Sequence, residues 1–472
     1  MSLCSVLPPA WRTALAATVV VALAACAVGP DYRPPSAAQL SVPDAYPSGA
    51  RQPVDVAELR QWWTRFDDPV LAELVERSLD ANLEIAAAEA RLRTARASLT
   101  AARAAWWPAL GASVDGSSRN VSDTPGGAVE TWQAGFDAAW EVDVFGGTRR
   151  AAEAAAAGVG EAGATLENVR SSIAAEVALN YIDARSAQQR LQVARESLAS
   201  QDETVRITGW RHQAGLVSAQ DVEQATVLRA QTAAAVPQLR ATFVAAANRI
   251  ATLLGESPGG IAARLDAVAA AIPLGPDAIG AGVPAELLRR RPDLIAAERA
   301  VAAEVARIGV AQADLYPALR LGGSLTSTTL AFGDLGGDLV SAIGGSITVP
   351  LFQGGQLRAR VEGQRAAADA ALAAYESAVL RALEDVDNAM QAIVAAHERE
   401  QQLEIAQAAA ERSVALARTR YQSGLIDFQS LLDAERSLLS TRESRLNARA
   451  ARAGASVQLY KALGGGWPSP AA

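Results

Sequence analysis

Very few side chains in this sequence could carry out covalent or metal chemistry. It contains two cysteines, Cys4 and Cys26, and two histidines, His212 and His397. A structural zinc site or a disulfide framework needs more of these residues, at suitable spacings. His397 begins a His-Glu-Arg-Glu segment that lacks the second histidine of the zinc-protease motif. The sequence therefore predicts no metal site.

One glycine motif has the spacing of a dinucleotide-binding loop. Residues 158–163 fit GxGxxG, and Asp183 follows about 20 residues later. Such a loop needs a buried parallel strand before it, whereas these glycines lie within an alanine-rich stretch that favours helix. Asp385 and Asp387 are two residues apart, so a helix would point them in different directions. We predict no cofactor and no enzymatic activity.

The composition points to long helices instead of a large globular core. Of 472 residues, 50% are hydrophobic by type, but only 5% are aromatic and 20% are charged. Alanine is the most abundant of these hydrophobic residues, and it favours helix while burying little surface per residue. The formal net charge is −8. A nucleic-acid-binding protein would present a basic face, so nucleic acid is excluded as a partner.

The N-terminus has the pattern of a secretory signal that ends at a cysteine. Residues 1–25 carry one basic residue, Arg12, followed by an apolar stretch too short to span a bilayer comfortably. Small residues then precede Cys26, as in a bacterial lipobox, where the chain is cut before the cysteine and its thiol is acylated. The alternative is a plain signal peptide with an incidental cysteine. No run of 18 apolar residues follows residue 30, so no ordinary transmembrane helix is predicted there.

The remainder of the sequence consists of two repeats of one unit. Three pairs of similar segments each lie 209 positions apart. The pairs are Trp107-Pro108-Ala109-Leu110 with Tyr316-Pro317-Ala318-Leu319, Arg211–Leu216 with Arg420–Leu425, and Leu254-Gly255 with Leu463-Gly464. Each repeat is predicted to contain a first helix, a β-hairpin and two long helices. The predicted helices are 83–105, 148–210 and 219–254, then 294–315, 356–421 and 428–463.

Four strands are predicted, two in each repeat. Residues 132–144 alternate between apolar and polar positions, which is the pattern of a strand with one wet face. The others are 110–121, 319–331 and 339–351, with loops rich in Ser, Asn, Asp and Gly over 115–128 and 326–338. Four strands cannot close a membrane barrel, and an open edge is forbidden in lipid. Three chains would pool twelve strands; two chains, with eight, remain an alternative.

Several motifs resemble one family. The segment Cys26-Ala27-Val28-Gly29-Pro30-Asp31-Tyr32-Arg33-Pro34 resembles the mature start of lipoprotein outer-membrane factors of the TolC/OprM/NodT type. The segments Leu288–Leu294, Arg420–Gly424 and Leu431–Arg436 are similar to further signatures of that family. The resemblance implies a homotrimer with a twelve-stranded outer-membrane β-barrel, four strands per chain, continuous with a long periplasmic α-helical barrel. It also implies a passive exit duct that works with a periplasmic adaptor and an inner-membrane pump of the resistance–nodulation–division class.

The expected organisation follows from the repeats and from this resemblance. The segments are a signal peptide (1–25), a lipid-anchored N-terminal and equatorial segment (26–82), a first repeat (83–254, with its β-hairpin at 109–145), an equatorial linker (255–292), a second repeat (293–464, with its β-hairpin at 318–352) and a C-terminal tail (465–472).

Two groups of residues are candidate functional sites at the periplasmic tip. Gly215 and Gly424 lie where the chain reverses between two helices, and a left-handed glycine suits such a turn. With Arg211 and Arg420 they are predicted to contact the adaptor; the alternative is that they only form turns.

The second group is a predicted gate. Asp433 and Arg436 are three residues apart and share a helix face, and Tyr421 is a candidate partner for Asp433 on a neighbouring helix. The first repeat has Gln224 and Val227 at the equivalent positions, so only the second hairpin could supply this ring. The alternative is an ordinary surface ion pair.

Four other functions remain open at this stage. The duct could serve type I protein secretion or metal-ion efflux instead of drug efflux. A periplasmic coiled-coil spacer would have the helical hairpins without the membrane strands. An envelope enzyme is the weakest alternative, because no catalytic set is present.

Overall fold

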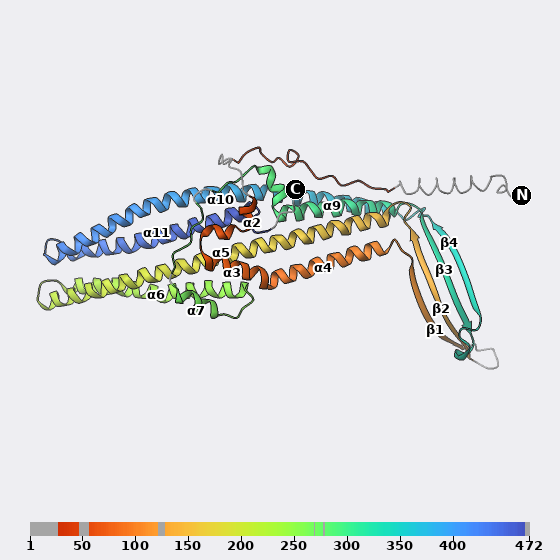
Figure 1. The fold of residues 1–472 in the computed structure, drawn as a ribbon, viewed down its shortest axis with the longest axis horizontal. Helices are drawn as coiled ribbons and strands as arrows, with labels where there is room; N and C mark the ends of the chain where they lie inside the picture. Colours follow the sequence, from red (N-terminus) through yellow and green to blue (C-terminus); the bar gives the residue numbers. More distant parts are fainter. Residues whose placement is uncertain (1–26, 47–55, 121–127, 269, 277–278, 468–472) are drawn as a thin grey trace. The chain divides into compact units, whose positions relative to one another are not determined.

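The structure is a computed structural model that describes residues 27–46, 56–120, 128–268, 270–276 and 279–467. The predicted signal peptide, residues 1–25, and Cys26 lie outside the described residues. The chain divides into two compact units, each assembled from three stretches of sequence (Figure 1). Unit 1 takes the residues up to 35, 90–163 and 296–377; unit 2 takes 36–89, 164–295 and 378–472.

Unit 1 contains a four-stranded antiparallel sheet in the order β1-β2-β3-β4. Its strands are β1 (Ala109–Asn120), β2 (Ala128–Val142), β3 (Ala318–Thr329) and β4 (Leu339–Thr348). The first and second repeats contribute adjacent hairpins, because β2 pairs with β3 from Trp132↔Thr329 to Val142↔Leu319. The outer edges of β1 and β4 are left unpaired within the described chain.

One face of this sheet is apolar and exposed. The strand register and the alternation of side chains place Phe136 beside Leu325 and Ala112 on this face. Exposed large apolar residues of the same face are Leu110, Val114, Leu321, Leu339, Ile343 and Ile347. The opposite face carries Asp137, and Glu141 pairs there with Arg320 at 2.9 Å. The sheet therefore has the two-sided pattern that the alternation in residues 132–144 predicts.

The helices within the described residues range from one turn to 67 residues. The four longest are α5 (Gly147–Gln213), α6 (Ala219–Leu253), α10 (Gln356–Gln422) and α11 (Phe428–Ala462). The others are α2 (Val56–Arg60), α3 (Pro69–Ala81), α4 (Leu83–Ala104), α7 (Gly260–Ala267), α8 (Leu287–Arg290) and α9 (Pro292–Ala313), with short 3-10 helices at Trp62–Phe66, Pro284–Glu286 and Phe332–Asp334. Among the described residues, no helix combines the length and the hydropathy that crossing a bilayer requires.

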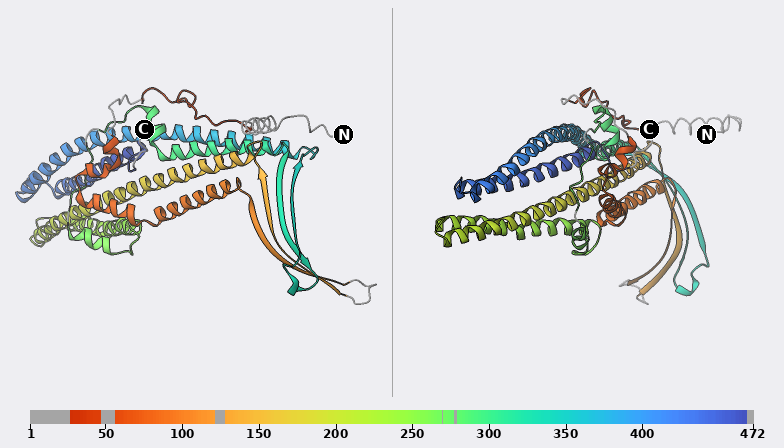
Figure 2. Two further views of the ribbon diagram at one scale, coloured as in Figure 1. Left: turned by 45° about the vertical axis from the view of Figure 1, so that its right-hand side comes forward. Right: turned by 60° about the vertical axis from the view of Figure 1, so that its left-hand side comes forward.

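Unit 2 contains two antiparallel helical hairpins (Figures 1 and 2). Hairpin 1 is the part of α5 in this unit with α6, and hairpin 2 is the corresponding part of α10 with α11. Ion pairs tie the two helices of each hairpin together, as between Arg249 and Glu176 in hairpin 1 and between Arg445 and Glu404 in hairpin 2. Small alanine side chains fill much of the buried seam, which lets helices of this length pack closely.

The body of unit 2 also holds a compact core around the short N-terminal helices. Trp62 is fully buried and stacks on Tyr460 of α11 at 5.6 Å between ring centroids. Arg185 is 1% exposed and donates to the carbonyl oxygens of Leu265 and Val268. This core joins segments from the start, the middle and the end of the sequence.

The element boundaries differ from the sequence-based ones mainly at the strands. Strands β1 and β3 continue to Asn120 and Thr329, so the loop predictions that began at residues 115 and 326 were wrong at their starts. Serine, threonine and glycine are accepted there because one face of the sheet is polar. Strand β4 ends at Thr348, two residues before Pro350, which cannot donate a ladder hydrogen bond.

Candidate functional site

The turn that closes hairpin 1 is a glycine C-cap. Gly215 has φ of 72°, and its amide donates to the carbonyl oxygen of His212 at 2.9 Å. The amide of Leu216 reaches back to the carbonyl oxygen of Arg211 at 2.8 Å. A residue with positive φ at this position allows the last carbonyl groups of the helix to accept hydrogen bonds from the turn. Glycine adopts a positive φ without strain.

The turn that closes hairpin 2 has the same geometry. Gly424 also has φ of 72°, and its amide donates to the carbonyl oxygen of Tyr421 at 3.0 Å. The amide of Leu425 donates to the carbonyl oxygen of Arg420 at 2.9 Å. Leu216 and Leu425 are both exposed, so each turn presents an apolar side chain to solvent.

The helices that leave the turns begin with different N-caps. Ser218 and Asp221 form a reciprocal capping box at the start of α6. Asp427 caps α11 alone, with its carboxylate accepting from the amide of Ser430 at 2.8 Å. Hydrogen bonds from Ser430 lower the pKa of Asp427 below its ordinary value. Hydrogen bonds therefore hold each turn both at the end of the helix before it and at the start of the helix after it.

Two of the predicted residues lie against each other across the two hairpins. The guanidinium carbon of Arg211 is 4.5 Å from the centre of the Tyr421 ring, and the arginine donates to the carbonyl oxygen of Tyr421 at 2.8 Å. Tyr421 is buried and packs on Phe428. Its phenol oxygen has no hydrogen-bond partner among the described residues, so within one chain it does not bond Asp433. Arg420, in contrast, is exposed.

Asp433 and Arg436 lie one helical turn apart on the surface of α11. Their closest charged atoms are 3.8 Å apart, and Asp433 also accepts from the side-chain amide of Gln429 at 3.2 Å. The side chains are 61% and 42% exposed, respectively. Within one chain this pair is open to solvent and free to meet another surface.

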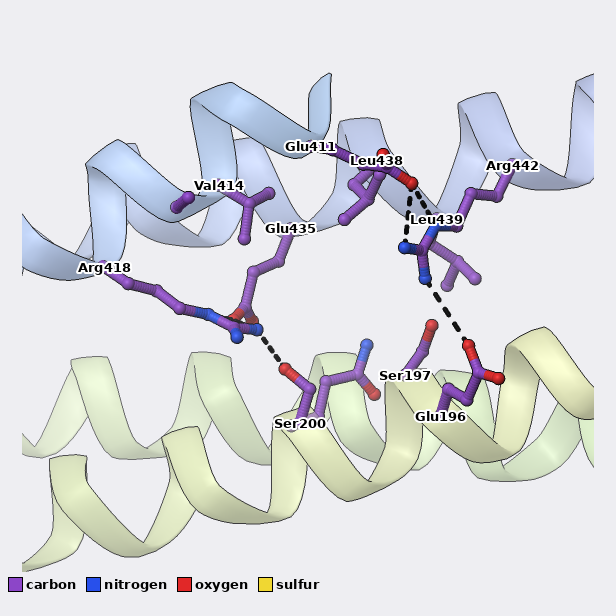
Figure 3. A pocket seen from close by; sticks show the side chains of 12 residues that line it. Glu196, Ser197, Ser200, Glu411, Val414, Arg418, Glu435, Leu438, Leu439 and Arg442 are labelled. Atoms are coloured by element: carbon purple, nitrogen blue, oxygen red, sulfur yellow. Dashed lines mark hydrogen bonds and ion pairs between the residues drawn. The ribbon is translucent and has the colours of Figure 1, made fainter. Parts of the chain in front are cut away.

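The buried acid of the tip is Glu435, which the sequence analysis did not single out. Its side chain is 5% exposed and pairs with Arg418 of α10 at 3.0 Å. Thr204 of α5 donates to the same carboxylate oxygen at 3.2 Å, and Arg418 also contacts the hydroxyl of Ser200. Glu435 and Arg418 therefore connect hairpin 2 to hairpin 1, and Figure 3 shows the contact between Arg418 and Ser200.

A second polar link lies about two turns farther along the same seam. Arg442 of α11 pairs with Glu411 of α10 at 2.9 Å and approaches Glu196 of α5 to 3.7 Å (Figure 3). A cavity of about 330 Å³ separates this link from the Glu435 link and is lined by residues of α5, α10 and α11. We call the contacts of Arg418, Glu435 and Arg442 across this seam the inter-hairpin link.

A signal for Glu435 was present in the sequence. Phe428, Leu431, Leu432 and Glu435 share the spacing of a single helix face, and the first three are buried. An acid on an apolar face needs a partner, but the partner lies on helices far away in the sequence. Among the described residues, no group of three or more His, Cys, Asp or Glu is arranged to hold a metal ion.

Comparison with known proteins identifies the family. Residues 74–256 and 283–465 each match the family described as "Outer membrane efflux protein". The chain is 33% identical to Nodulation protein T of Rhizobium leguminosarum bv. viciae, covering 96% of this chain and 94% of that protein. It is 32% identical to the pyoverdine export outer membrane protein OpmQ of Pseudomonas aeruginosa, covering 88% and 89%. The structure of the outer-membrane channel OprN matches with a TM-score of 0.84 and 38% identity, covering 94% and 100%.

These matches confirm the predicted class of fold, in which each chain contributes four strands to a shared twelve-stranded barrel and long helices to a helical barrel. They also confirm the predicted location in the outer membrane and the role in efflux. The chain belongs to the outer membrane efflux protein family.

Proposed function

We propose that this chain is the passive exit duct of a tripartite efflux pump. It works as a homotrimer, with a periplasmic adaptor and an inner-membrane pump of the resistance–nodulation–division class, and it catalyses no reaction itself. Drugs and other toxic small molecules are the proposed cargo. The energy and the direction of transport come from the pump.

The observation that carries this proposal is the four-stranded sheet of unit 1. It has an exposed apolar face, a polar face and two edges that no described strand pairs with. In lipid every strand edge must be paired, so the sheet is complete only when copies of the chain close a barrel. The polar face, with Asp137, Glu141 and Arg320, would then line the lumen.

We also propose the division of the chain given by its repeats. The repeats are 83–254 and 293–464, with residues 255–292 as an equatorial linker and 26–82 as an equatorial, lipid-anchored segment. The two separate matches to one family support this division. Cys26 is the proposed acyl acceptor, because it follows small residues at the end of an apolar signal. Mass spectrometry of the mature N-terminus tests this, and a free thiol on Cys26 would contradict it.

The adaptor is proposed to dock on the two glycine turns. Each turn exposes one leucine, and hairpin 2 adds the exposed Arg420. Arg211 is already engaged by Tyr421, so it is a poor choice for testing docking alone. Arg420→Glu should reduce crosslinking to the adaptor without reducing trimer yield. Arg412→Glu, at an exposed position earlier on the same helix, is the control. Unchanged crosslinking in Arg420→Glu would leave the turns with a structural role only.

A deletion strain tests the function as a whole. Loss of the gene should increase susceptibility to several small-molecule toxins, and a plasmid copy should restore resistance. The purified protein should form a heat-modifiable trimer in detergent and conduct ions across planar bilayers. A strain that lost only the secretion of one polypeptide, or only resistance to one metal ion, would favour the alternative ducts.

A further inference from the structure

The first described residues are held against the connection between strand β2 and helix α5. We call residues 27–32 the N-terminal strap. The amide of Val28 donates to the carbonyl oxygen of Phe145 at 3.0 Å. Ala27 lies against Gly146, where a Cβ atom would come within 2.8 Å of the Ala27 Cα atom. The strap is therefore packed on the protein from its first described residue.

Arg150, in the first turn of α5, binds the strap through several atoms. Its Nε donates to the carbonyl oxygen of Val28 at 3.1 Å, and Nη2 donates to the carbonyl oxygen of Gly29 at 3.2 Å. The same Nη2 contacts the carboxylate of Asp31 at 2.8 Å. The Arg150 side chain is 7% exposed, whereas the Asp31 side chain is 82% exposed. A buried guanidinium is thus satisfied largely by the strap.

Two glycines make the room for this arrangement. A Cβ on Gly29 would come within 2.5 Å of the Gly309 Cα atom, so the strap backbone rests directly on α9. A Cβ on Gly309 would come within 2.7 Å of the Arg150 side chain. Side chains at either position would lift the strap or displace the arginine.

A second polar contact holds the end of the strap. The phenol of Tyr32 donates to the carboxylate of Glu298 on α9 at 2.9 Å. Burial and the Glu298 charge raise the pKa of Tyr32, so it stays protonated and remains a donor. The segment Gly29-Pro30-Asp31-Tyr32 therefore has a structural explanation at three of its four positions.

We propose that Arg150 is a positioning residue that clamps the N-terminal strap, so that an acyl anchor on Cys26 is held beside the β2–α5 connection. This inference rests on the lipoprotein character proposed above. With the strap released, residues 27–35, three of which are prolines, would act as a semi-rigid tether that reaches up to about 28 Å. The clamp removes that freedom, and it couples membrane attachment directly to the sheet that must enter the membrane.

The docking of the strap is measured first, with a nitroxide on Arg33→Cys in the purified full-length trimer. Arg33 is exposed, so the label should not disturb the clamp. Arg150→Ala should increase the mobile fraction of the label about tenfold or more, which corresponds to the loss of one charge-assisted hydrogen bond. Arg149→Ala, whose side chain is 60% exposed, should leave the label unchanged. A label that stays immobile in Arg150→Ala overturns the clamp.

Because loss of a buried arginine can itself impair folding, Asp31→Ala is tested in parallel. This substitution removes one hydrogen-bond partner of Arg150 from the strap, while Arg150 itself stays in place. It should increase label mobility in the same direction with a normal trimer yield. Arg150→Lys, which keeps the charge but loses the forked donor geometry, should be intermediate.

The role in anchoring is tested by combining the clamp variants with loss of the acyl group. Pulse-chase labelling in cells follows the appearance of the heat-modifiable trimer. Asp31→Ala and Arg150→Ala should slow trimer formation when Cys26 is present. They should cause no further slowing in a Cys26→Ser chain secreted through a non-lipoprotein signal. Equal slowing in both backgrounds would mean a purely structural role and would overturn the proposal.

The same experiment separates this proposal from the proposed function. A parent chain that lacked the acyl group, or formed no trimer, would refute the lipoprotein duct. If the trimer forms without the acyl group, the spin-label result on the strap still stands, because the strap contacts lie within one chain.

Discussion

Glu435 is the side chain whose environment has the strongest consequence for the tip. Its carboxylate is buried and accepts from both Arg418 and Thr204, while its second oxygen has no partner among the described residues. Removing such a buried carboxylate lowers the stability of the fold, because the donors of Arg418 and Thr204 lose their acceptor.

Glu435→Ala should therefore loosen the seam between the two hairpins. The expected loss in local stability is about 1.5–3 kcal/mol, toward the lower end because the Arg418 side chain is 44% exposed. Hydrogen exchange of peptides from the start of α11 measures it. Asp433→Ala, two residues away and exposed, is the control and should change exchange by less than about 0.5 kcal/mol. Equal effects of the two variants would show that burial of Glu435 does not matter.

Asp31 gives a prediction on pH. Its hydrogen bond and ion pair with Arg150 lower its pKa below the ordinary value of 3.8. A carboxylate with a lowered pKa in the folded chain contributes stability above the ordinary value and loses it as the pH falls through the lowered value. The spin label on Arg33→Cys should stay immobile from neutral pH down to about 5 and become mobile only below 3.8. Asp31→Asn should abolish this pH dependence; a transition near pH 6 would mean that another group controls the strap.

Single residues could be predicted from sequence only where their partners are local. The i,i+3 spacing of Asp433 and Arg436 correctly places them on one helix face, since the helix alone determines it. Arg211 and Tyr421 were assigned to different roles, although the structure brings them into contact. The inter-hairpin link was missed because Arg418 and Ser200 are far apart in the chain, and no periodicity reports which helices become neighbours.

At the scale of elements, the glycine turns make a sharp test of backbone conformation. Gly215 and Gly424 share the same positive φ, and a Cβ on either would meet nothing within 4 Å. Alanine should therefore cost about 1–2 kcal/mol from the left-handed backbone alone, equally at both turns. Gly209→Ala is the matched control, since Gly209 lies within α5 with equally open surroundings and no positive φ. It should be neutral or slightly stabilising.

Local hydrogen exchange at the two tips distinguishes these variants. Gly215→Ala and Gly424→Ala should raise exchange in their own turns and leave the other turn unchanged. A destabilisation by Gly209→Ala as large as theirs would show that the turns need glycine for a reason other than φ.

The two faces of β2 provide a test of membrane insertion. Phe136 is 65% exposed on the apolar face, and Asp137 lies on the polar face. Phe136→Arg should cost about 2–4 kcal/mol if its position is near mid-membrane, because a charge would face lipid. Asp137→Arg should be tolerated. Trimer yield and the temperature of trimer dissociation measure both variants, and equal tolerance would mean that β2 does not span the membrane.

The elements themselves were largely predictable. The long helices follow from alanine-rich sequence interrupted only by glycine turns, and the structure places α5 and α10 within a few residues of the predicted ranges. The predicted strands 110–121 and 319–331 end within two residues of β1 and β3, but the predicted loops 115–128 and 326–338 overlap them, because Ser, Thr and Gly occur both in loops and on the wet face of a sheet. Helix α9 begins at Pro292, where proline fits the first turn, so the prediction of a start at Leu294 was slightly late.

At the scale of the whole molecule, the two repeats share a backbone but differ in charge. The turns have equivalent geometry, yet Arg418 and Glu435 correspond to Gly209 and Thr226 in the first repeat. Among the described residues, the Arg418–Glu435 part of the inter-hairpin link thus occurs once per chain, with hairpin 2 supplying both charges and hairpin 1 supplying the hydroxyls of Thr204 and Ser200. Repetition predicts the elements of the second half from the first, but it does not predict this asymmetry.

The same asymmetry defines the proposed gate. Asp433 and Arg436 are exposed and only loosely paired within a chain, so they are available to neighbouring chains in a trimer. Three copies of each would lie near the axis if the tips converge there. Charge-assisted hydrogen bonds between chains would then close the duct while no pump is attached.

Replacing both gate residues should open the resting channel. Asp433→Ala with Arg436→Ala should raise single-channel conductance in planar bilayers and sensitise cells to a large antibiotic that the outer membrane normally excludes. Trimer stability should be unchanged, because both side chains are largely exposed and their ion pair contributes only about 0.2–0.5 kcal/mol. Gln224→Ala with Val227→Ala, at the equivalent positions of hairpin 1, is the matched control and should conduct like the parent. If the Asp433 and Arg436 double variant also conducts like the parent, these residues do not hold the gate.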